Sequence, residues 1–288
     1  MDLRSMLEFP MFQNAFMAGT LVAIVAGVVG YFLLLRGLTF AGHALSHVGF
    51  AGAAGALVLG IDPVFGLLAF TLLAGMGIAA MGKRIDERDT TIGVIMTLLL
   101  ACGSLFIALY HAYAEQAYSV LFGTVMGISR ADVLLTAVLF VIVLAGMAAV
   151  FRMLLFASYD PQVAEARGVP VKFLAFVFMI FLAITVTLSV QIVGVLLIFT
   201  LLVGPAAAAM RLSASPPRAI LLSTVLAVAY TWLGIYVAIR QNYPVTFCIA
   251  TIAFAAYVLV RIFEASPLPR LFAGGRRQTS PTVQESAA

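Results

Sequence analysis

Charge is scarce in this chain. Only 10% of its 288 residues are Asp, Glu, Lys or Arg, while 64% are apolar; charged residues make up about a quarter of an ordinary soluble domain. There are only two cysteines, Cys102 and Cys248, and both lie inside apolar runs, so we expect packing residues there and not a disulfide or a metal pair. No stretch is polar enough to form a separate soluble domain. The composition excludes a tethered cytosolic enzyme and indicates an integral membrane protein.

Uncharged stretches of the length that crosses a bilayer, about 20 residues, follow one another along the chain. They are 9–35, 37–61, 63–82, 90–114, 133–151, 173–210, 219–239 and 241–260. The stretch 173–210 is too long for one crossing, and Ser189, Gln191 and Gly194 provide a polar break in its middle. We therefore expect an all-α bundle of eight or nine transmembrane helices, nine by this count. The uncharged segment 116–129 is shorter and favours a re-entrant or short helix over a full crossing.

The distribution of Lys and Arg predicts the orientation of the bundle. If the N-terminus is outside, all of the 16 basic residues except Arg4, Arg130 and Arg240 fall on the cytoplasmic side. We expect the N-terminus outside, the C-terminus inside and no cleavable signal peptide, because the first apolar run is too long and ends in Arg36. Residues 1–263 form the transmembrane unit, and 264–288 read as a disordered cytoplasmic tail. The small net charge of +4 suggests no nucleic-acid partner.

The ionisable residues inside the apolar stretches are histidines. His43 and His47 are four residues apart, so a helix places them on one face, one turn apart. Imidazoles with this spacing suit zinc or a similar divalent ion. The alternative is a pair of buried histidines bonded to backbone carbonyls. The small residues of 49–60 favour close helix packing, which makes this helix a central one.

Other candidate residues lie nearer the ends of the predicted helices. His111, beside tyrosines and Glu115, is either an interfacial residue or a contact in metal entry. Asp160 followed by Pro161 predicts a helix start, and Gly168 with Pro170 predicts its end, so 158–170 reads as a short helix on the cytoplasmic face. It is a surface connector or a docking element. Gly204 and Pro205 predict a kink, a weak indication of gating.

Four segments together resemble the permease subunit of bacterial zinc/manganese ABC transporters. The segments are 35–49 (LRGLTFAGHALSHVG), 121–124 (LFGT), 159–168 (YDPQVAEARG) and 193–206 (VGVLLIFTLLVGPA). The resemblance implies a type II ABC-importer-like fold, a homodimer enclosing a metal pathway, and location in the bacterial inner membrane. It also implies a separate cytosolic ATPase that binds the coupling helix, with Asp160, Pro161, Ala164, Glu165 and Gly168, and a periplasmic metal-binding protein on the outer face.

The sequence differs from the usual pattern of such permeases at one position. Such permeases usually carry an aspartate where this chain has His43, while the histidine at His47 is kept. Imidazole suits zinc and carboxylate suits manganese, so we expect zinc as the cargo, with manganese or iron as the alternative. The metal passes through and no cofactor is bound permanently. We therefore expect a transport subunit and not an enzyme; the rivals are an ion-coupled secondary transporter and a membrane enzyme with a metal at the histidine pair.

Overall fold

The computed structural model describes residues 9–81, 85–109, 123 and 127–265, and all the regular structure in these ranges is helical. His111 and most of the segment 116–129 lie outside the described residues, as does the tail from residue 266. The helices are α2 (Pro10–Leu35), α3 (Thr39–Val58), α4 (Pro63–Ala80), α5 (Ile85–Leu109), α7 (Arg130–Tyr159), α8 (Pro161–Ala166), α9 (Val171–Val193), α10 (Val195–Leu212), α11 (Pro216–Gln241) and α12 (Val245–Ala265). The last helix includes Glu264 and Ala265, the first two residues of the predicted tail.

Seven helices of the described part are long and apolar enough to cross a membrane: α2, α4, α5, α7, α9, α11 and α12. The chain is therefore a multi-pass membrane protein. The expected total of eight or nine crossings also needs α3 and α10, and it stays a prediction for them. Two histidines and several glycines lower the hydropathy of α3, and the apolar part of α10, Leu197–Leu212, is shorter than the others.

Local sequence explains where several helices begin. Proline occupies the first turn of α2, α4, α8 and α11, where its missing N–H leaves no hydrogen bond broken. Asp62 caps α4 by accepting a bond from the backbone N–H of Val64, and Asp160 caps α8 by accepting one from that of Val163. These side chains satisfy backbone groups that would otherwise lack partners at a helix end.

The predicted break in the stretch 173–210 lies at Gly194. This residue has φ 84° and ψ 162°, a backbone conformation open essentially to glycine alone, and it separates α9 from α10. Gln191 and Ser189, the other residues predicted for the break, are still within α9. The chain therefore turns at one glycine and not across a polar loop.

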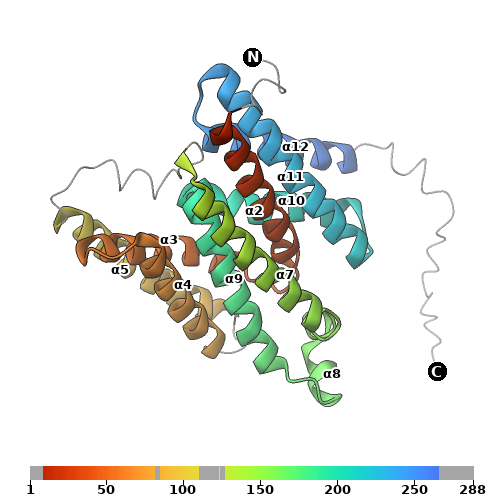
Figure 1. The fold of residues 1–288 in the computed structure, drawn as a ribbon. Helices are drawn as coiled ribbons and strands as arrows, with labels where there is room; N and C mark the ends of the chain where they lie inside the picture. The colour runs from red at the N-terminus through yellow and green to blue at the C-terminus, as the bar shows by residue number, and fades with distance from the viewer. Residues whose placement is uncertain (1–8, 82–84, 110–122, 124–126, 266–288) are drawn as a thin grey trace, which may run out of the picture.

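The helices form two groups joined by α9 and α10 (Figure 1). Helices α3, α4 and α5 pack together on one side, whereas α2, α7, α11 and α12 lie on the other. Glycines allow close approach within each group: Gly52 of α3 and Gly66 of α4 lie backbone to backbone, and the Ser223 hydroxyl of α11 donates to the carbonyl oxygen of Gly27 in α2 at 2.8 Å. The buried core between the groups includes Phe32, Leu45, Phe178 and Ile198.

Candidate metal site

The two histidines of α3 face each other in the structure. The ring centroids of His43 and His47 are 4.7 Å apart, with an angle of 80° between the ring planes. Both side chains are half-buried, and their neighbours Ala44, Ser46 and Val48 are buried. Helix α3 contacts α4, α5, α9 and α10, which confirms the predicted central position. The two imidazoles are therefore partly enclosed by the surrounding helices.

Phe199 of α10 covers one side of the pair. Its ring centroid lies 5.0 Å from that of His43, and the two planes meet at 73° in an edge-to-face arrangement. An aromatic hydrocarbon ring offers no lone pair to a cation. One side of the imidazole of His43 is therefore closed by an apolar wall.

Among the residues that the structure describes, the pair has no third ligand. Within the part of the chain that the structure describes, no group of three or more His, Cys, Asp or Glu side chains comes together. A structural zinc site has four protein ligands, so two imidazoles from one chain match transient coordination better. Cys102 in α5 is half-buried and Cys248 in α12 is buried, and both are free thiols.

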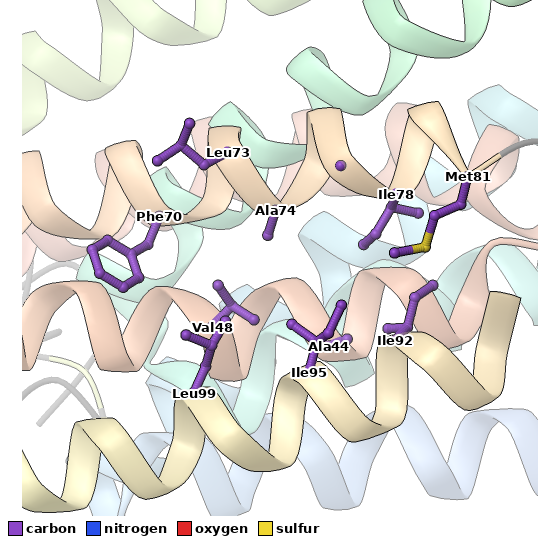
Figure 2. A pocket seen from close by; sticks show the side chains of 11 residues that line it. Ala44, Val48, Phe70, Leu73, Ala74, Ile78, Met81, Ile92, Ile95 and Leu99 are labelled. Atoms are coloured by element: carbon purple, nitrogen blue, oxygen red, sulfur yellow. The ribbon is translucent and has the colours of Figure 1, made fainter.

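An apolar cavity lies next to the histidine helix but does not contain the pair. It has a volume of about 350 Å³ and lies between α3, α4 and α5 (Figure 2). Ala44 and Val48 line it, each one residue after a histidine, and successive residues of a helix point about 100° apart. No polar side chain lines the cavity, so it offers a metal ion no ligand.

The short helix predicted after Asp160 is present as α8, at the end of the bundle between α7 and α9 (Figure 1). Ala164 is completely buried and fixes α8 to the bundle, whereas Pro161, Val163 and Glu165 are exposed. Gly168 has φ 81°, and its N–H donates to the carbonyl of Glu165. A positive φ after a helix end favours glycine, which explains why the helix ends there.

The residues predicted for a kink lie in the second half of α10. Gly204 and Pro205 are both within the helix, which continues to Leu212. Because proline has no N–H, the carbonyl of Leu201, four residues earlier, loses its helical partner. The helix is thus weakened at this position, without ending there.

Sequence reasoning missed two contacts around the break at Gly194. The first is the contact of Phe199 with His43, which the sequence did not signal because Phe199 is an ordinary apolar residue there. The second is Asp132 in the first turn of α7, whose Oδ1 accepts a bond from Gln191 Nε2 at 3.1 Å. The Ser129-x-x-Asp132 spacing is a capping-box pattern, and both of its bonds are formed, so the sequence did carry a signal for Asp132.

Comparisons with known proteins identify the family. The model of the ABC 3 transport family matches residues 8–264. The manganese import system permease protein ScaB of Streptococcus parasanguinis is 33% identical over 259 residues, which cover 90% of this chain and 92% of that protein. The manganese transport system membrane protein MntC of Listeria monocytogenes is 30% identical over 235 residues, covering 81% and 84%.

A solved structure agrees with these relatives. PsaBC from Streptococcus pneumoniae in complex with Fab has 30% sequence identity and a TM-score of 0.81, covering 90% of this chain and 93% of that one. The predicted resemblance is thereby confirmed. The chain belongs to the ABC 3 transport family and is the permease subunit of a metal ABC importer of the zinc/manganese type, a transport subunit whose ATP hydrolysis is carried out by a separate protein.

Proposed function

We propose that this chain conducts Mn²⁺ across the membrane of a bacterial cell, driven by a separate ATPase. The observation that carries the proposal is the half-buried His43–His47 pair on the central helix of the bundle. Ionisable side chains within a membrane bundle are costly to place and are typical of ion pathways. With no third protein ligand among the described residues, the pair holds a passing ion only briefly.

The choice of manganese corrects the expectation of zinc. Zinc was inferred from the imidazole at His43 alone, whereas the named relatives are manganese permeases. Two imidazoles are compatible with that cargo. Divalent manganese binds nitrogen ligands more weakly than the later metals of its series, and a conduit must release the ion that it binds. Weak binding by two histidines therefore favours passage over retention.

The coupling to ATP hydrolysis is assigned to α8. The helix is capped by Asp160, is fixed by the buried Ala164 and ends at Gly168, so it is well suited to transmit force from a docked protein. Its exposed residues, including Glu165, would contact the ATPase. Arg36, Arg167 and Lys172 lie around the same end of the bundle, at the end of α2, after α8 and at the start of α9, which favours this end as the cytoplasmic one.

The remaining parts of the assembly follow from the family. The proposed unit is a homodimer of this chain in the bacterial inner membrane, with the N-terminus outside and the C-terminus inside. A periplasmic binding protein delivers the metal to the outer face. A homodimer brings two histidine pairs to one assembly, and hydration water supplies any further ligands.

Uptake of radioactive manganese tests the proposal. The chain is expressed with its partner ATPase and binding protein in cells that lack their own high-affinity manganese and zinc importers. We expect uptake that requires the ATPase. A small excess of unlabelled Mn²⁺ should inhibit this uptake, whereas the same excess of Mg²⁺ should not. Zinc uptake without manganese uptake would show that the cargo is zinc, as expected from His43. Uptake that persists without the ATPase would indicate a secondary transporter instead.

A further inference from the structure

The first half of α10 has a break in the helix before it and a weakened point after it. Gly194 stands before it with a φ of 84°, and Pro205 follows, where the helix lacks one backbone hydrogen bond. The intervening segment, Val195–Gly204, is a short piece of helix between two weakened points. Such a piece moves as a unit when the backbone dihedrals at its ends change.

One side of the Gly194 hinge is held in place. Gln191, at the end of α9, donates to Asp132, whose other carboxylate oxygen accepts bonds from the backbone N–H and hydroxyl of Ser129. Gly123 lies directly against the same end of α9: a Cβ placed on it would be 2.5 Å from the carbonyl carbon of Val193. The end of α9 is therefore anchored from two directions, so a change of the backbone dihedrals at Gly194 would move α10 relative to a fixed α9.

The segment between the two breaks carries Phe199, whose ring stands against His43. A cation bound by His43 and His47 together needs room beside both rings. In the structure the phenyl ring of Phe199 reduces that room on the side of His43. Displacing α10 about Gly194 would withdraw Phe199 from His43, while leaving His47 and the rest of α3 in place.

We propose that Phe199 is the residue that controls access of the cation to His43, with Gly194 as the hinge of the segment that carries it and the Gln191–Asp132 bond as the anchor of the hinge. The inference rests on the proposed function, because it assigns a role to a residue beside the proposed pathway ligands. It predicts that removing the ring opens the pathway in the absence of ATP. A purely structural role for Phe199 predicts no more leak than the loss of a phenylalanine elsewhere in the bundle.

The test uses the whole permease–ATPase complex in vesicles loaded with Mn²⁺, with efflux measured before and after ATP is supplied. We expect Phe199→Ala to raise the ATP-independent flux several-fold and to lower net accumulation. Phe199→Leu, which keeps apolar bulk but not the flat ring, should leak to an intermediate degree. The matched control is Phe16→Ala, which removes a buried phenylalanine that contacts Trp232 and not a histidine.

The two proposals fail in different ways. Wild-type complex without ATP-driven manganese transport would overturn the proposed function. Wild-type transport together with unaltered flux in both Phe199 variants would overturn the role of Phe199 alone. A leak in Phe16→Ala as large as that in Phe199→Ala would also overturn it, because the effect would then reflect loosened packing and not the contact with His43.

Discussion

The hydroxyl oxygens of Thr71 in α4 and Thr187 in α9 lie 3.0 Å apart in the buried interior. They join the α3–α5 group to the rest of the bundle. Each hydroxyl also lies close to a carbonyl oxygen of its own helix, Thr71 at 2.8 Å from that of Leu67 and Thr187 at 2.9 Å from that of Ala183. One threonine can therefore donate to the other, while the second donates to its own carbonyl. Neither helix needs this bond for its own backbone. The contact is therefore a link between the two groups and not part of either helix.

Thr71→Val should weaken that link. We expect a loss of roughly 1 kcal/mol, the usual size of a hydrogen bond between membrane helices, measured as the free energy of unfolding in mixed detergent. The control is Thr97→Val, which removes a hydroxyl that bonds only within α5, to the carbonyl of Gly93. Equal losses of unfolding free energy in the two variants would show that the contact between α4 and α9 adds no stability beyond that of a hydroxyl bonded within one helix.

The close approach of α3 and α4 gives a second prediction. A Cβ at Gly52 would collide with the backbone of Gly66, so Gly52→Ala should force the helices apart and destabilise the bundle by about 1–3 kcal/mol, the usual cost of overpacking. Gly77→Ala is the matched control, since a Cβ there meets nothing within 4 Å. Thermal unfolding of the purified permease measures both. A Gly52→Ala protein as stable as the control would contradict the packing.

Replacing the proposed metal ligands gives a third prediction. His43→Ala combined with His47→Ala should reduce manganese uptake to the level of cells without the permease, while the protein still inserts and binds its ATPase. His43→Asp adds a carboxylate, the ligand type that manganese prefers, and should raise the ratio of manganese to zinc uptake. Normal uptake by the double variant would remove the histidine pair from the pathway. A lower ratio for His43→Asp would contradict the reasoning about the ligand at position 43.

The end of the bundle at α8 gives a fourth prediction. Asp160→Ala removes the helix cap, at a cost of about 1 kcal/mol, and should lower transport per ATP hydrolysed, as should Glu165→Lys on the exposed surface. Gly168→Val should do the same by straining the positive φ. Reconstituted vesicles report transport and hydrolysis together. Asp62→Ala, which removes the equivalent cap of α4, is the control; wild-type coupling in all three α8 variants would argue against docking there.

Much of the architecture could be predicted from the sequence alone. The apolar stretches, the helix start at Asp160 and Pro161, and the glycine at the end of α8 all depend on residues close together in the chain. A membrane helix satisfies its own backbone hydrogen bonds within one segment, so its position is a local property. The i, i+4 spacing of His43 and His47 is local for the same reason, and the sequence therefore determined that the two rings share a face.

The tertiary structure decided what surrounds that face. Phe199 is 156 positions from His43, and Gln191 is 59 from Asp132. No periodicity connects residues so far apart, because their contact depends on how whole helices pack. The same holds for the break at Gly194, which the sequence confined to a short region but did not assign to one residue. Helix formation is a local property of the chain, whereas the walls of the proposed metal pathway come from helices distant in sequence and exist only once the bundle has assembled.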